Sequence, residues 1–153
     1  MINTSLLTPG RTCCRVPGSS KKRTFEFIAD TISLEGQLAS DDIFSNLITR
    51  ERLGSTGFGN GIAIPHSRMS ACKKITGCLI TLAEPIDYDA PDDIPVDILF
   101  ALLVPEDEQQ AHLNILGALA ELLNDENNRQ RLRNCQSDTE LFNTFTELFK
   151  LPN

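Results

Sequence analysis

The residues from Val96 to Val104 form a nearly continuous apolar run that Pro105 ends. Such a run is typical of a central strand that is covered on both faces. Segments with the apolar spacing of helices precede, separate and follow this and other strand candidates. The sequence therefore predicts an α/β fold class, with a mixed sheet sandwiched between helices.

Apolar spacing and capping residues predict the other elements. Ser19 or Ser20 is expected to cap a helix over residues 21–34, and Ser40 or Asp41 a helix that ends near residue 53. The remaining predictions are strands over residues 62–64 and 76–82, and helices over residues 108–124, 126–133 and 138–149. Residues 1–18 contain two Pro-Gly turns and are expected to be irregular. The length of 153 residues favours a single domain over residues 1–153.

The composition argues against several classes of protein. A net charge of −7 argues against general nucleic-acid binding. No apolar run approaches the length of a membrane span, and the start of the chain lacks the pattern of a signal peptide. The cysteines are odd in number and form no CxxC pair. We therefore expect reduced thiols in a cytoplasmic protein, with no metal site and no disulfide framework.

The charge is unevenly distributed along the chain. Residues 83–108 contain many acids and no base, whereas bases flank His66 in sequence: Arg50, Arg52, Arg68, Lys73 and Lys74. These bases fit an ordinary solvated surface. They also fit a basic rim around the histidine that favours a phosphoryl group or an acidic partner.

The glycine-rich segment over residues 54–61 suggests a nucleotide loop, but its details do not fit one. It lacks the Lys-Ser/Thr ending of a Walker A loop, and it lacks both the spacing and the preceding strand of the dinucleotide fingerprint. The glycines are expected to permit a tight turn with positive φ. Exposed backbone N–H groups at Gly59, Asn60 and Gly61 are expected to help hold a phosphoryl oxygen.

The chain has two histidines, and His66 directly follows Pro65. The proline restricts Ile64 to extended geometry, so the imidazole leaves the strand end in a fixed direction. Histidine takes up and hands on protons or phosphoryl groups near neutral pH. From the residues alone, His66 fits either a catalytic role or that of a satisfied structural histidine.

Two further side chains are candidates for the same chemistry. His112 lies four residues before Leu116, on the apolar face of a helix whose dipole disfavours a charged imidazole near its start. A neutral ring there can bind an anion, or it can simply be a partly buried histidine. Arg50 can bind two oxygens at once, or it can complement the dipole at the end of its helix.

Two segments of the chain resemble a known family. The segment Arg50-Glu51-Arg52-Leu53-Gly54-Ser55-Thr56-Gly57-Phe58-Gly59-Asn60-Gly61-Ile62-Ala63-Ile64-Pro65-His66 resembles the phosphorylation-site block of the fructose/mannitol class of phosphotransferase-system IIA proteins. Residues 95–105 and 108–113 resemble the central strand and second-histidine helix of that family. The nitrogen-regulatory branch is the most similar, since it carries no attached membrane or carrier domain.

The resemblance implies a fold and a function. The expected fold is a sheet of about five strands with helices on both faces. His66 is expected to accept a phosphoryl group from the phosphohistidine of a small phosphocarrier protein, with His112, Arg50 and the phosphoryl-binding residues, including Ser67, in support. No cofactor is expected. The regulated partners implied are proteins such as transporters or sensor kinases.

The sequence also departs from the family, and other functions stay open. Ser67 stands where many members have glycine, and residues 11–18 match poorly. A sugar-specific IIA protein would instead pass the phosphoryl group to a IIB domain. A metal-dependent hydrolase would need a metal site, but His66 and His112 lie far apart in sequence and form no metal-binding motif.

Overall fold

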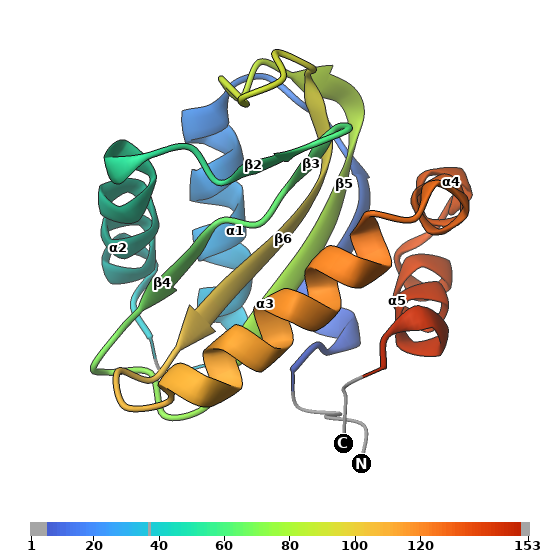
Figure 1. Ribbon diagram of the computed structural model, residues 1–153. Coiled ribbons are helices and arrows are strands. Elements are labelled where there is room, and N and C mark those ends of the chain that lie inside the picture. Colours follow the sequence, from blue (N-terminus) through green and yellow to red (C-terminus); the bar gives the residue numbers. More distant parts are fainter. Residues whose placement is uncertain (1–5, 37, 151–153) are drawn as a thin grey trace.

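The computed structural model describes residues 6–36 and 38–150 and shows a mixed sheet between two layers of helices (Figure 1). The strands of these residues are β1 (Thr12–Val16), β2 (Gly57–Gly59), β3 (Ile62–Ala63), β4 (His66–Arg68), β5 (Thr76–Ile86) and β6 (Val96–Val104). Their order is β1-β5-β6-β3-β2, and β4 also pairs with β6. The helices are α1 (Lys21–Glu35), α2 (Ser40–Leu53), α3 (Gln109–Leu123), α4 (Glu126–Asn134) and α5 (Asp138–Leu148), with a 3-10 turn η1 (Pro9–Arg11) before β1. The predicted α/β fold class is confirmed.

Strand β6 divides the core into two halves, as its apolar sequence predicts. The even-numbered residues 98–104 pack in one hydrophobic cluster with α3, α4 and α5. The odd-numbered residues 99–103 pack in a second cluster with α1 and α2. Side chains alternate across a strand, so a strand covered on both sides needs an apolar residue at nearly every position. Asp97 is the half-buried exception.

The expectation of an irregular N-terminal segment is wrong for Thr12–Val16, which form β1. This strand pairs in parallel with β5, Thr12 with Leu79 and Cys13 with Ile80. The buried Arg11 side chain fixes its start by donating to the Gly77 carbonyl at 2.8 Å. The register shifts between Cys13 and Val16, so the strand lacks a simple alternating pattern. Residues 1–5 of that prediction lie outside the described residues.

The predicted helix ends agree with the structure to within a residue or two, but one predicted cap is wrong. Ser20 caps α1, since its hydroxyl oxygen accepts from the Arg23 N–H at 3.1 Å. The second helix already includes Ser40, and the residue before it, Ala39, supplies no side-chain cap. The Ser40 hydroxyl donates instead to Asp30 on α1, which ties the two helices together.

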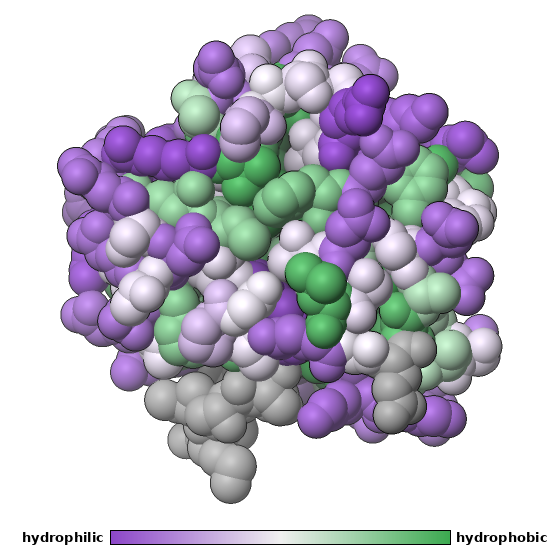
Figure 2. All heavy atoms as spheres, turned by 180° about the vertical axis from the view of Figure 1, so that it is seen from behind, coloured by the Kyte–Doolittle hydropathy of each residue, from purple (hydrophilic) through white to green (hydrophobic). Residues whose placement is uncertain are grey.

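Seen from behind, the molecule is hydrophilic over much of its outer surface, with a band of apolar side chains across the middle (Figure 2). A hollow between α1 and the sheet is lined by apolar side chains that include Val16, Phe27 and Leu82. Among the residues that the structure describes, none of the helices combines the length and the apolar character that a membrane span requires.

Candidate active site

A break between two short strands positions His66. Strands β3 and β4 run parallel to β6 along the same edge, with Ile62 beside Ile98 and His66 beside Leu102. Pro65 has no N–H to continue the ladder. The N–H of Ile64 turns away to the Thr56 carbonyl at 3.1 Å, whereas the Pro65 carbonyl accepts from the Leu102 N–H at 2.8 Å. His66 is therefore the first residue after the break.

The ring of His66 is held through one nitrogen. Its Nδ1 lies 2.7 Å from the carbonyl oxygen of Ile64. A carbonyl oxygen only accepts hydrogen bonds, so Nδ1 carries the proton in the neutral ring. The lone pair of that tautomer is on Nε2. The imidazole thus has a fixed orientation and one nitrogen that can act as a nucleophile.

In the structure, the ring of His112 lies next to that of His66. The two ring centroids are 5.4 Å apart and meet edge to face, at an interplanar angle of 62°. His112 lies in the first turn of α3, with its backbone N–H bonded to the Glu108 carbonyl at 3.0 Å. Its Nε2 is buried and has no hydrogen-bond partner among the described residues. A buried polar atom without a partner is costly, so this nitrogen is an unsatisfied hydrogen-bonding group beside His66.

The surroundings of both histidines favour the neutral rings. Burial lowers the pKa of His66, and the positive charge of Arg50 lowers it further, against the Ile64 hydrogen bond and the charge of Glu51, which raise it. Burial likewise lowers the pKa of His112, with added repulsion from His66 and Arg68. A neutral His66 has a lone pair for attack at neutral pH.

Arg50 lies in the last turn of α2 and contributes charge to this site. Its guanidinium donates from Nη1 to the Gly54 carbonyl at 3.0 Å, so the predicted interaction with the helix end is present. The same positive charge acts on the pKa of His66. The structural role and the electrostatic one therefore coexist. Ser67 follows His66 on β4, and its hydroxyl lies 3.3 Å from the Arg68 carbonyl.

The structure places the turn of Gly59, Asn60 and Gly61, which was predicted to help hold the phosphoryl group, away from His66 along the sheet edge. The Gly61 carbonyl accepts from the N–H groups of Asp97 and Ile98, and Ile98 lies four positions along β6 from Leu102, the residue beside His66. At about 3.3 Å per residue, the separation along the strand is about 13 Å.

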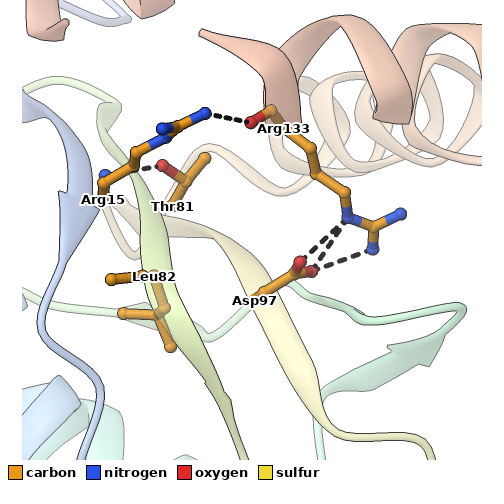
Figure 3. A pocket seen from close by; sticks show the side chains of 6 residues that line it. Arg15, Thr81, Leu82, Asp97 and Arg133 are labelled. Carbon is orange, nitrogen blue, oxygen red and sulfur yellow. Dashed lines mark hydrogen bonds and ion pairs between the residues drawn. The ribbon is translucent and has the colours of Figure 1, made fainter. Parts of the chain in front are cut away.

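The turn formed by these three residues is bound to other groups. The N–H of Asn60 donates to Asp92 at 2.9 Å, and its carbonyl accepts from Arg133 at 2.9 Å. Figure 3 shows Arg133 on the carboxylate of Asp97, where an ion pair of 2.8 Å fixes it. The positive φ values of Gly59, Asn60 and Gly61 do confirm the predicted tight turn.

Sequence reasoning missed a buried polar cluster beside the site. Glu51 is only 8% exposed and forms an ion pair of 2.7 Å with Lys21. It also binds Thr56, and both residues contact the hydroxyl of the buried Tyr88. Glu51 lies between two arginines in the segment that ends at His66. However, its charge made it look like a surface residue, and nothing in the spacing indicates that it is buried.

The described residues contain no group of three or more His, Cys, Asp or Glu side chains placed to hold a metal ion. All five cysteines are free thiols.

Comparison with known proteins identifies the family. Residues 5–148 match the family described as "Phosphoenolpyruvate-dependent sugar phosphotransferase system, EIIA 2". The chain is 47% identical to the nitrogen regulatory protein of Pseudomonas aeruginosa over 138 residues. The matched region covers 90% of each chain. The structure of the nitrogen regulatory protein IIA-Ntr from Neisseria meningitidis superposes with a TM-score of 0.84 at 38% identity, over 91% of this chain and 95% of that one.

A more distant structure has the same fold. The mannitol enzyme IIA of Escherichia coli, in a complex with its phosphorylated enzyme IIB, superposes with a TM-score of 0.73 at 18% identity, over 92% of this chain and 97% of that one. The chain therefore belongs to the EIIA 2 family of the phosphoenolpyruvate-dependent sugar phosphotransferase system, in which it is similar to the nitrogen regulatory proteins.

Proposed function

We propose that this protein is a phosphohistidine carrier with a regulatory output. His66 accepts a phosphoryl group from the phosphohistidine of a small phosphocarrier protein. Its phosphorylation state then changes contacts with regulated proteins such as transporters or sensor kinases. The observation that carries this proposal is the pair of histidines. One ring has its Nδ1 on a backbone carbonyl, and the other has a buried Nε2 without a partner.

The transfer step needs no proton to move. The Nε2 lone pair of His66 attacks phosphorus as the N–P bond of the donor breaks, and that bond's electron pair returns to the donor's ring nitrogen. The Nδ1 proton of His66 stays on the Ile64 carbonyl throughout. The product ring then carries its proton on one nitrogen and the phosphoryl group on the other, with one positive charge on the ring. The donor ring, protonated on its own second nitrogen, leaves as neutral imidazole, so atoms and charge balance.

The neighbouring side chains stabilise the phosphoryl group during its transfer. Phosphoryl transfer depends mainly on positioning and on stabilisation of negative charge. In the proposed complex, His112 donates from Nε2 to a phosphoryl oxygen, since its Nε2 is buried without a partner in the described residues. The charge of Arg50 attracts the same group, and its effect on the pKa of His66 supports this role.

Phosphorylation would act on partners through charge. A phosphoryl group brings about two negative charges, partly offset by the protonated His66 ring, to a site where both rings are neutral beforehand. Such a change alters which surfaces can dock there.

The free state of all five cysteines supports a cytoplasmic location for this exchange, where thiols stay reduced.

The first experiment is labelling by a phosphorylated phosphocarrier protein of the same system. We expect acid-labile phosphate on the wild-type chain and none on His66→Ala. His112→Ala is the matched control, because it removes an imidazole 5.4 Å away and should slow labelling without abolishing it. Wild-type labelling that persists in His66→Ala would exclude His66 as the acceptor.

A sugar-specific role is the second candidate, because the mannitol IIA protein of the same fold is found in a complex with a phosphorylated IIB enzyme. Binding experiments with the unphosphorylated chain and with His66→Asp separate the two. Regulatory function predicts partners that differ between the two forms and include proteins other than IIB domains. Recovery of a IIB domain alone from both would favour sugar transport.

A further inference from the structure

Glu51 is a buried carboxylate that contacts both α1 and the segment that leads to His66. It lies in the last turn of α2, next to Arg50, and is only 8% exposed. Burying a carboxylate is costly unless it is paired and hydrogen-bonded. The ion pair of 2.7 Å with Lys21 supplies the counter-charge. Lys21 in turn lies over the ring of Tyr88, 4.2 Å from its centroid.

Both oxygens of Glu51 hold Thr56. Oε2 accepts from the Thr56 N–H at 2.9 Å, and Oε1 accepts from the Thr56 hydroxyl. The hydroxyl of Tyr88 lies 2.8 Å from that of Thr56. Burial beside Glu51 raises the pKa of Tyr88, so this hydroxyl keeps its proton and donates within the cluster. A carboxylate that accepts from both the backbone and the side chain of one residue fixes the position of that residue.

Thr56 is linked to His66 by two hydrogen bonds through Ile64. Its carbonyl accepts from the Ile64 N–H at 3.1 Å, and the Ile64 carbonyl accepts from Nδ1 of His66 at 2.7 Å. Ile64 lies in the break between β3 and β4, where the ladder with β6 does not hold it. The hydrogen bond that the Ile64 N–H donates to the Thr56 carbonyl therefore holds Ile64 in place on this side.

We propose that Glu51 is a positioning residue for His66. Through Thr56 and Ile64 it holds the acceptor of Nδ1 in place, which keeps the proton on Nδ1 and the lone pair on Nε2. Glu51 does not touch the phosphoryl group. The inference rests on the proposed function only for its effect on rate, because the tautomer of His66 is a property of the unphosphorylated protein.

The variants separate this role from general stability. Thr56→Val removes the hydroxyl at nearly constant volume, and Glu51→Gln removes the charge and one strong acceptor. Thr56→Ser keeps the hydroxyl and serves as the conservative variant. Thr31→Val is the matched control, because Thr31 is also buried and donates its hydroxyl at 2.8 Å, but to the Phe27 carbonyl within its own helix.

Two measurements are made on each folded variant. The nitrogen chemical shifts of the His66 ring report the tautomer without any phosphoryl donor. Rates with a phosphorylated phosphocarrier protein are then split into kcat and KM. We expect the wild type, Thr56→Ser and Thr31→Val to keep the Nδ1–H tautomer and similar rates. In Thr56→Val and Glu51→Gln the Nε2–H tautomer should appear, and kcat should fall by up to about a hundredfold with little change in KM.

The outcomes decide between positioning and stability. An unchanged tautomer in folded Thr56→Val would overturn the proposal, as would an equal loss of kcat in Thr31→Val. If Glu51→Gln does not fold, Thr56→Val alone decides. If the wild type accepts no phosphoryl group, the proposed function fails, whereas the tautomer measurement still tests whether Glu51 positions His66.

Discussion

At the scale of single residues, the site depends on two opposite demands on His66. A nucleophile needs a neutral ring with an available lone pair, whereas the incoming phosphoryl group needs positive charge nearby. Burial and the charge of Arg50 lower the pKa of His66, which favours the neutral ring. In the proposed transfer, the same arginine would favour the neutral ring before the step and the negative phosphoryl group during it.

Replacing Arg50 by Gln should separate these two effects. The pKa of His66 should rise towards its ordinary value, because the repulsion of the imidazolium is lost. Phosphoryl transfer should slow by about a hundredfold, in line with the loss of one preorganised donor. An NMR titration of the His66 ring measures its pKa, and the labelling rate measures phosphoryl transfer. Arg52→Gln is the control, since Arg52 is an exposed neighbour on the same helix turn. Equal effects in the two variants would contradict the role of Arg50.

Gly61→Ala tests the separation between the glycine turn and His66. Gly61 has φ +83, and an added Cβ would lie 2.5 Å from Nη2 of Arg133. The unfolding free energy should fall by about 1–3 kcal/mol, measured by urea unfolding. The labelling rate of the folded protein should stay close to that of the wild type, because the turn does not touch the ring.

The control for this variant is Gly117→Ala on α3, where an added Cβ meets nothing within 4 Å. That change should stabilise the helix by up to about 1 kcal/mol. A large loss of labelling in folded Gly61→Ala would show instead that the turn takes part in binding the phosphoryl group.

At the scale of elements, the sequence predicts what local patterns determine. The apolar run of β6 needs cover on both faces, and the structure confirms its bounds from Val96 to Val104. The spacing of apolar residues locates the five helices to within a residue or two. Strand β1 was missed because its formation depends on a distant partner, β5, and on the buried Arg11 side chain. The Ser40 cap was wrong because Asp30, on another helix, binds that hydroxyl.

The same distinction applies to the site. The order Ile64-Pro65-His66 correctly predicts that the ring is presented by a constrained backbone. The distance of Gly59, Asn60 and Gly61 from the ring could not be predicted, because proximity in sequence does not reveal that the segment from β3 to β4 runs about 13 Å along β6. The role of Glu51 depends on Thr56, Lys21 and Tyr88, which come from separate parts of the chain. Only the fold brings them together.

At the scale of the whole molecule, the two histidines link stability to pH. In the unfolded chain both rings take up protons at their ordinary pKa, whereas in the folded chain burial lowers the pKa of each. The unfolded state therefore binds more protons as pH falls through the ordinary histidine range, and the folded state loses stability there. The loss continues until pH reaches the lowered pKa values of the folded chain.

Urea unfolding between pH 7.5 and about 5 measures this linkage. We expect the free energy of unfolding to decrease as pH falls over this range. A variant with both His66 and His112 replaced by Ala should show a clearly smaller decrease. An equal slope in the wild type and the double variant would show that the lowered pKa values do not govern stability in this range.

The central claim is that Nε2 of His66 carries the phosphoryl group. The measurement that tests it most directly is NMR of the phosphorylated, nitrogen-15-labelled protein, in which the coupling between phosphorus and nitrogen identifies the bonded atom. The account predicts coupling to Nε2 of His66, with Nδ1 still protonated and bonded to the Ile64 carbonyl. Coupling to Nδ1 of His66, or to a nitrogen of His112, would contradict it.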